Sequence, residues 1–295
     1  MRKCLAAWSG ACALMLASPA LAQDEVSPDE PDRPWSLSLG GGVSIVSQGE
    51  DPWSSSVDLT RSLGDASVSL GYSRTSENGQ QGVPLSLASK SETISASVGY
   101  AIGSVSLDVH GSYGVSRFEV ARLNRRTGRT LSLDGDGKMM SVGGSLSYGK
   151  GLDLHTSLSA SVSLSWDRSD TARVLAGPLG NAIIRKERQS GITGNASVAL
   201  SRTFGEGDQH VFGLNAGIVA SDNAAASASS IRRRGAARAL RPRPGFESND
   251  TWNEFGASLG LGLTDQLSLD FWAMRTMGMK GPESNSLSSG LSFAF

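Results

Sequence analysis

The feature that most constrains this chain is a two-residue alternation of apolar and polar side chains over long stretches. In LDLHTSLSASVSLSW (152–166) the even positions are apolar or Thr, and the odd positions are Asp, His and then only Ser. Side chains two residues apart share one face of a β-strand, so the segment has one apolar and one polar face. Strands of soluble proteins usually have about five or six residues, whereas a strand that crosses a bilayer needs about nine to eleven. The alternation therefore predicts membrane-crossing strands.

About twelve such segments follow from the same pattern. They span 35–46, 53–62, 66–76, 92–102, 104–117, 138–149, 152–167, 189–204, 209–220, 250–263, 266–277 and 285–295. Short links alternate with longer links at 77–91, 118–137, 168–188, 221–249 and 278–284. Short turns at one end and long loops at the other are typical of bacterial outer-membrane barrels. The sequence therefore predicts an all-β fold, a transmembrane antiparallel up-and-down β-barrel of about twelve strands with both termini on the periplasmic side.

The N-terminus has the three parts of a secretory signal peptide. Arg2 and Lys3 precede an apolar stretch, and Ala20-Leu21-Ala22 forms a small-x-small cleavage site before Gln23. Cleavage removes both cysteines of the chain, so neither a disulfide nor a thiolate metal site is expected. The predicted organisation is a signal peptide at 1–22, a short acidic periplasmic segment at 23–34 and an outer-membrane barrel at 35–295.

Aromatic residues concentrate at the predicted strand ends. One set precedes short turns and a second set lies beside the long links. The first set is Tyr100, Tyr148 and Phe204, and the second is Tyr72, Tyr113, Trp166 and Trp252. Such a distribution predicts two aromatic belts at the membrane interfaces.

The chain ends in SLSSGLSFAF, which has Leu291, Phe293 and Phe295 on one strand face. This pattern resembles the C-terminal signal that outer-membrane proteins present to the barrel-assembly machinery. About twelve strands with a closing Phe are also similar to the translocator domain of autotransporters. The resemblance implies the fold and the assembly route but not the function. Only 23–34 precedes the first strand, so we expect no passenger domain.

The polar face of the strands is predicted to line the barrel lumen. It consists mainly of Ser, Gly, Thr and Ala, which are too small to fill a barrel of about twelve strands. Asp58, Asp108 and Asp270 are in phase with this face. Two interpretations remain open: these carboxylates form a weakly cation-attracting ring, or they hydrogen-bond to serines and hydrate the wall.

The long link at 221–249 is strongly basic. No acidic residue lies between Asp222 and Glu247, and the arginines are Arg232, Arg233, Arg234, Arg238, Arg241 and Arg243. Arginine forms forked contacts with carboxylate and phosphate. The segment is thus predicted to bind anions. The ligand is either lipopolysaccharide of the surrounding membrane or an anionic solute or polysaccharide at the pore mouth.

No enzyme motif is present. The histidines are His110, His155 and His210, without metal-ligand spacing, and the chain has no G-x-S-x-G elbow and no phosphate loop. His155 and Ser157 share a face, but residues two apart in a strand are about 7 Å apart. We therefore expect no catalytic residue, no metal, no cofactor and no nucleic-acid partner.

Two function classes remain after these exclusions. The first is an outer-membrane pore or export channel for small or anionic polymeric solutes, including polysaccharide. The second is a non-conducting surface barrel that uses its basic loops for lipopolysaccharide packing or adhesion. The two classes differ in whether the link at 221–249 plugs the lumen, which the sequence does not determine.

The signal peptide generates a first prediction. We expect the mature protein to begin at Gln23, because signal peptidase cleaves after a small-x-small site. N-terminal sequencing and intact-mass measurement of the membrane-extracted protein test this. A start before position 15, or a lipid attached to Cys12, would contradict it.

Overall fold

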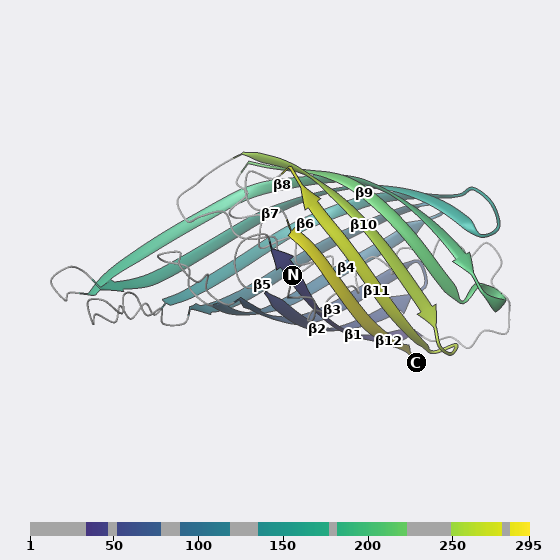
Figure 1. The fold of residues 1–295 in the computed structure, drawn as a ribbon, viewed down its shortest axis with the longest axis horizontal. Helices are drawn as coiled ribbons and strands as arrows, with labels where there is room; N and C mark the ends of the chain where they lie inside the picture. The colour runs from purple at the N-terminus through teal and green to yellow at the C-terminus, as the bar shows by residue number, and fades with distance from the viewer. Residues whose placement is uncertain are drawn as a thin grey trace, which may run out of the picture.

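The strands form one closed antiparallel sheet. The computed structural model describes residues 34–46, 52–77, 89–118, 135–176, 182–222, 249–278 and 284–295. Each strand pairs with its neighbours in sequence, and β1 pairs with β12, which gives an up-and-down barrel (Figure 1). The strands are β1 (Trp35–Val46), β2 (Trp53–Leu63), β3 (Ala66–Glu77), β4 (Ser89–Ile102), β5 (Val105–Phe118), β6 (Gly135–Gly151), β7 (Thr156–Ala176), β8 (Ala182–Phe204), β9 (His210–Ser221), β10 (Asp250–Gly262), β11 (Leu267–Met277) and β12 (Ser284–Ala294). The predicted transmembrane barrel of about twelve strands is confirmed.

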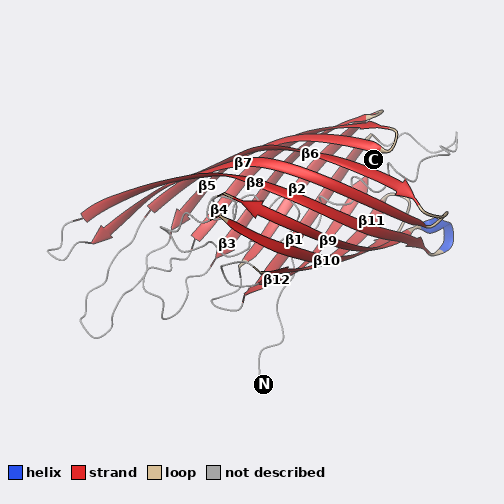
Figure 2. Cartoon of the chain, turned by 90° about the horizontal axis from the view of Figure 1, so that it is seen from above, coloured by secondary structure: helices blue, strands red, loops and turns tan. Residues whose placement is uncertain are grey.

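The first and last strands close the barrel. Their register runs from Ser36↔Ala294 to Val46↔Ser284. At the short-turn end Trp35 N donates to Phe295 O at 3.1 Å, and Phe295 N donates to Trp35 O at 2.9 Å. The C-terminus lies at the same end as the short 3-10 helix Glu206–Asp208, which forms the turn between β8 and β9 (Figure 2). Closure removes the sheet edges that would otherwise expose unpaired backbone groups to lipid.

The outer face of the barrel is apolar. Large hydrophobic side chains are exposed at alternate positions along the strands, for example Leu70, Ile94 and Leu164. Aromatic side chains are exposed at both ends of this surface. Tyr100, Tyr148 and Phe204 lie at the short-turn end, and Tyr72, Tyr113 and Trp166 lie at the long-loop end. An apolar wall with an aromatic girdle at each end is the outer surface of a transmembrane barrel.

Trp252 is not part of the outer belt, contrary to the sequence prediction. Phe255 is exposed on the outer face of β10, so the alternation directs Trp252 inward, where it is 1% exposed. Its Nε1 donates to Oε1 of Glu254, the next inward residue, at 3.0 Å. The phase of the strand, rather than the position of the residue near a strand end, decides which face an aromatic side chain occupies.

The predicted long link at 168–188 is wrong for most of its length. β7 and β8 continue their pairing from Thr156↔Arg202 to Ala176↔Ala182, whereas the β8–β9 pairing ends at Thr193↔Ser221. β6 accompanies β7 as far as Gly135↔Arg173. The three strands form an arm that extends beyond the rest of the barrel (Figure 1). In this barrel the apolar side chains lie on the lipid-facing side, so the apolar alternation is lost in the charged arm.

The start of β7 also differs from the prediction. Residues 152–155 form a turn, although they continue the alternation of the following strand. His155 N donates to Asp153 Oδ1 at 2.8 Å, which stabilises the turn. This backbone hydrogen bond is the main cause that lowers the pKa of Asp153 below its usual value. Within the described ranges no helix is long and apolar enough to cross a membrane.

The closure of β12 on β1 generates a second prediction. Phe295 is exposed on the outer face, and its ring stacks on Phe293 with 5.7 Å between the centroids. Phe295→Asp places a charge at the membrane interface and removes the terminal aromatic ring, so we expect the yield of assembled barrel to fall severalfold. Heat-modifiable gel mobility and outer-membrane fractionation measure this yield.

The conservative variant Phe295→Tyr serves as the control, since it keeps an aromatic ring at the same place. It should assemble like the wild type. Normal assembly of Phe295→Asp would show that the terminal ring has no part in barrel formation.

Candidate functional site

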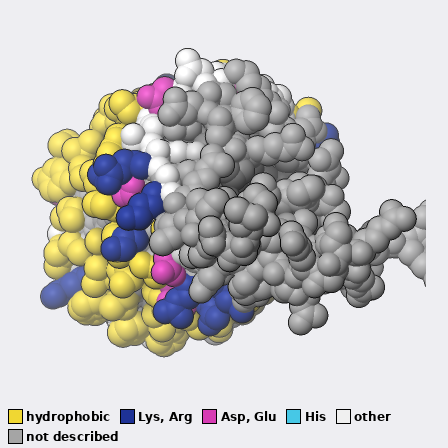
Figure 3. Space-filling model, turned by 90° about the vertical axis from the view of Figure 1, so that its left-hand side faces the viewer, with side chains coloured by type: hydrophobic (Ala, Val, Ile, Leu, Met, Phe, Trp, Pro, Cys, Tyr) yellow, Lys and Arg dark blue, Asp and Glu magenta, His cyan; other side chains and the backbone are white. Residues whose placement is uncertain are grey.

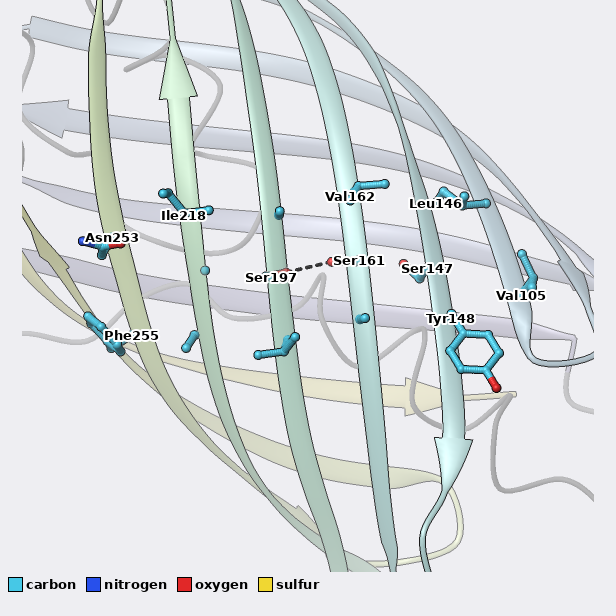
Figure 4. Close-up of a pocket in the computed structure, with 15 residues that line it drawn as sticks. Val105, Leu146, Ser147, Tyr148, Ser161, Val162, Ser197, Ile218, Asn253 and Phe255 are labelled. Atoms are coloured by element: carbon cyan, nitrogen blue, oxygen red, sulfur yellow. Dashed lines mark hydrogen bonds between the residues drawn. The ribbon is translucent and has the colours of Figure 1, made fainter.

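The lumenal wall is the candidate site, and it carries pairs of hydroxyl groups on adjacent strands. Serine and threonine hydroxyls hydrogen-bond to one another across adjacent strands at 2.7–2.9 Å. The pairs are Ser38–Ser292, Thr60–Ser69, Ser157–Ser201 and Ser161–Ser197; the last is drawn in Figure 4. Each hydroxyl has one donor and two acceptor sites, so a paired hydroxyl still has acceptor capacity for water. The wall is therefore hydrophilic.

The charged side chains of the lumenal face are all acidic among the residues whose side chains are described. They are Asp58, Asp108, Asp167, Asp250, Glu254 and Asp270. They come from β2, β5, β7, β10 and β11, so they are distributed around the circumference rather than gathered in one place. No group of three or more His, Cys, Asp or Glu within the described strands and turns is arranged to hold a metal ion.

The three carboxylates predicted from the sequence have different surroundings. Asp58 lies over Gly71, where an added Cβ would collide with its Oδ1. Asp270 is almost completely buried, and its Cα partners on both sides are glycines, Gly260 and Gly290. Its Oδ1 has no hydrogen-bond partner in the described structure. Asp108 belongs to a cluster that the sequence analysis did not identify.

That cluster is built around His110 on β5. The Nδ1 atom of His110 lies 2.6 Å from Oδ1 of Asp108, two residues earlier on the same face. The ring extends over Gly143 of β6, its Cα partner. A Cβ on Gly143 would lie 2.8 Å from His110 Nε2 and 2.9 Å from Ser165 Cβ. The glycine thus leaves the space in which the imidazole approaches β7.

Asp167 forms the other side of the cluster. Ser165 Oγ donates to Asp167 Oδ2 at 3.1 Å, and Ser141 Oγ donates to Asp167 Oδ1. The register of β6 and β7 places Ser141 directly opposite Asp167. The imidazole and Asp108 on β5, together with Asp167 on β7 on the other side of β6, can bind a proton or attract a cation. The sequence shows Asp108, His110 and Asp167 in lumenal phase, but their proximity depends on strand register.

The cluster has the residue types of a hydrolytic triad without its geometry. A nucleophilic serine is activated when its hydroxyl donates to a histidine base. Here the Ser165 hydroxyl donates to Asp167 instead. The other histidine considered in the sequence, His155, has its Nδ1 3.0 Å from Asp208 Oδ1 in the neighbouring turn. The described contacts therefore provide no activated nucleophile.

The lumen differs between its two ends. At the long-loop end inward side chains are buried, including Ser44, Ser91 and Asp167, whereas inward serines near the short turns are partly exposed. The expectation of a lumen lined mainly by small residues is wrong on the β10–β11 side. Trp252, Trp272 and Met274 face inward there and are buried. The accessible part of the polar wall is thus at the short-turn end.

The remaining predicted site residues divide into two groups. Leu291, Phe293 and Phe295 lie on the outer face of the closing strand and its C-terminal end. The six arginines of the predicted anion-binding segment lie outside the described residues, as does most of the link at 221–249. The predicted signal peptide at 1–22 and the acidic segment at 23–34, apart from Pro34, also lie outside them.

This geometry defines the protein as a transmembrane β-barrel of the bacterial outer-membrane type with a hydrophilic, acidic lumen. No protein-family model matches the chain, and no curated protein matches it in sequence.

Similar solved structures include two autotransporter barrels and one channel. The translocator domain of autotransporter NalP from Neisseria meningitidis has a TM-score of 0.65 and 17% identity, over 96% of this chain and 93% of that one. The β-domain of the Bordetella autotransporter BrkA has a TM-score of 0.61 and 11% identity, over 88% and 98%. The COG4313 outer membrane channel from Pseudomonas putida F1 has a TM-score of 0.53 and 12% identity, over 92% and 100%. At these identities the likeness shows the fold alone.

The close approach over Gly143 generates a third prediction. Gly143→Ala places a Cβ 2.6 Å from the carbonyl oxygen of Leu164, a backbone atom that cannot rotate away. We expect the barrel to lose about 1–3 kcal/mol of stability, the usual cost of overpacking. Urea unfolding of the detergent-solubilised barrel, followed by tryptophan fluorescence, measures the loss.

Gly111→Ala is the matched control. It makes the same chemical change on the neighbouring strand, where the nearest atom to the new Cβ is Ser141 O at 3.8 Å. If the two variants unfold at the same urea concentration, the packing described for the His110 cluster is wrong.

Proposed function

We propose that the protein is an outer-membrane pore for small hydrophilic solutes, with a preference for neutral and cationic ones. The observation that carries the proposal is the charge of the lumenal wall. Its described side chains include six carboxylic acids and neither lysine nor arginine, on a background of serine hydroxyls, and Asp58 and Asp108 are the two acids that are partly exposed. Carboxylates that line a channel attract cations and repel anions. A closed barrel with an apolar outside needs a hydrophilic inner wall only if the lumen contains water.

The acidic wall argues against passage of a polyanion. Each repeat of an anionic polysaccharide would meet carboxylates from several strands, and like charges raise the energy of the bound polymer. The anionic and polysaccharide substrates considered in the sequence analysis rested on Arg232–Arg243. We therefore propose that any anion selection takes place at the mouth, not in the lumen.

The location proposed for this pore is the bacterial outer membrane. The signal-peptide pattern, the aromatic girdles and the terminal Phe295 support export and assembly as a multi-pass barrel. We propose no enzymatic activity, because Ser165, which lies beside His110 across Gly143, donates its hydroxyl proton to a carboxylate. The similarity to the COG4313 outer membrane channel is consistent with a pore.

One observation favours a second function. The inward side chains at the long-loop end are buried, including the indole rings of Trp252 and Trp272. A barrel closed at one end would not conduct, and it would act through its outer surface as a structural or adhesive protein. Conductance measurements separate the two functions directly.

Ion selectivity provides the fourth prediction. We expect Asp58→Asn combined with Asp108→Asn to lower the cation-to-anion permeability ratio by roughly two- to threefold at low salt, since two lumenal charges are lost. The effect should weaken as salt rises, because the Debye length falls to about 8 Å at physiological ionic strength. Planar-bilayer recordings under a salt gradient give the ratio from the reversal potential.

Two further variants serve as comparisons for the measured permeability ratio. Asp65→Asn removes a carboxylate from the exposed β2–β3 turn and should leave the ratio unchanged. Deletion of 229–246 should shift selectivity toward cations if this segment sets the charge at the mouth, or raise conductance sharply if it is a plug. Absence of channels in the wild type and in the deletion would discard the pore and favour the surface barrel.

A further inference from the structure

The outer rim of the barrel carries a surplus of positive charge that the proposed pore does not use. Above the outer aromatic girdle, the outward positions of the described strands hold eight basic and three acidic side chains. The basic ones are Arg74, Lys90, Arg117, Lys138, Arg168, Lys186, Arg188 and Arg275, and the acidic ones are Glu92, Asp136 and Asp170; Asp222, exposed in the bend after β9, adds a fourth acid at this end. Figure 3 shows Lys and Arg side chains gathered where the apolar wall ends.

The densest part of this rim lies on the three strands of the arm. Lys138 of β6, Asp170 of β7 and Arg188 of β8 lie side by side in the register. Arg168 Nε donates to Asp170 Oδ2 at 2.9 Å, and Arg188 Nε donates to Asp170 Oδ1 at 2.7 Å. One carboxylate therefore holds two guanidinium groups next to a lysine. Three positive charges and one negative charge leave a net charge of +2 on this patch.

The two arginines still have donors for a ligand. Both contact Asp170 through Nε, so the Nη groups are not used in these hydrogen bonds. The side chain of Arg188 is 71% exposed and that of Arg168 is 32% exposed. A guanidinium presents its N–H groups as a planar fork that matches phosphate oxygens. Asp170 orients both forks and offsets the repulsion between them.

The height of the patch matches that of lipid headgroups. Trp166 is exposed on the same face of β7, two residues below Arg168, and Met140 is the Cα partner of Arg168 on β6. Two residues along a strand correspond to about 7 Å. An aromatic residue of the girdle marks the boundary of the hydrocarbon. Arg168 therefore lies just above the acyl chains, beside the apolar wall, and Arg188, opposite Asp170, lies about two residues further out.

The opposite rim has the reverse charge balance. Around the short turns the described charges are five acidic and three basic side chains. They are Asp65, Asp153, Glu206, Asp208 and Asp265 on the acidic side, and Arg61, Lys150 and Arg202 on the basic side. Arg61 lies over the ring of Trp35 at 5.1 Å. A need for solubility alone would not place the cations at one end, whereas anionic headgroups confined to one leaflet would.

We propose that Lys138, Arg168 and Arg188, held by Asp170, form a binding site for the phosphate groups of a phosphorylated glycolipid in the outer leaflet. The shared chemistry is recognition of a phosphate monoester by two guanidinium forks and one ammonium group. The apolar wall below Trp166 contacts the acyl chains of the same lipid molecule. This site faces the membrane, so it is independent of the pore and of the link at 221–249.

The test compares binding of three probes to the refolded full-length mature barrel in detergent. The probes are bisphosphorylated lipid A, lipid A with both phosphates removed, and inorganic phosphate, measured by native mass spectrometry. We expect the phosphorylated lipid to bind at least about tenfold more tightly than the dephosphorylated one, and Arg168→Gln with Arg188→Gln to remove most of that difference. Binding should weaken with added salt.

Lys150→Gln with Arg202→Gln is the matched control, because it removes two exposed outward charges from the opposite rim. It should bind the phosphorylated lipid like the wild type. Equal losses in both double variants would overturn the site in favour of a general charge effect. Inorganic phosphate that competes as well as the lipid would overturn the lipid assignment and leave a free-phosphate site.

Folding of the variants is checked by heat-modifiable gel mobility. If the double variant does not form a barrel, Arg188→Gln alone is used, since the side chain of Arg188 is more exposed than that of Arg168. Unchanged lipid affinity in a folded Arg188→Gln protein would overturn the proposal.

Discussion

The pairing of backbone N–H and C=O groups in a medium without water is the constraint on which the rest of this structure depends. An unsatisfied polar group in hydrocarbon costs several kcal/mol, so a sheet can cross a bilayer only when it closes. Closure is achieved by the pairing of β1 with β12, ending in the two hydrogen bonds between Trp35 and Phe295. The two termini of the barrel are therefore joined at the short-turn end, and every other strand needs only its sequence neighbour.

Closure gives the sheet an outer face and an inner face. Because successive side chains of a strand point to opposite faces, the register of a strand sets both faces at once. A shift of one residue in any strand would exchange lipid-facing leucines for lumenal serines and carboxylates. The same rule moves Trp252 from the expected girdle into the lumen, next to Glu254. The proposed pore and the proposed lipid site follow from this separation: carboxylates line the inside, and arginines line the outer rim.

Outside the hydrocarbon the sheet is stabilised by different interactions. In the arm, the ion pairs of Asp170 with Arg168 and Arg188 replace the apolar alternation. For this reason the sequence predicted the barrel strands well but missed the continuation of β7 and β8. The lumenal carboxylates Asp58, Asp108 and Asp270 were found from their phase, while the contact of His110 with Gly143 and Ser165 was not, because it depends on register between strands.

By itself, the sequence determined the fold class, the approximate number of strands, the faces that Leu164 and Ser165 occupy, and the closing role of the C-terminal segment. These properties are local, since a single strand already distinguishes lipid from lumen by alternate residues. Only the tertiary structure decided which inward residues lie close together and which strands extend beyond the membrane. Register brings Asp108 and His110 of β5 toward Ser165 and Asp167 of β7 across Gly143 of β6, and such non-local proximity has no signal in the spacing of residues along one chain.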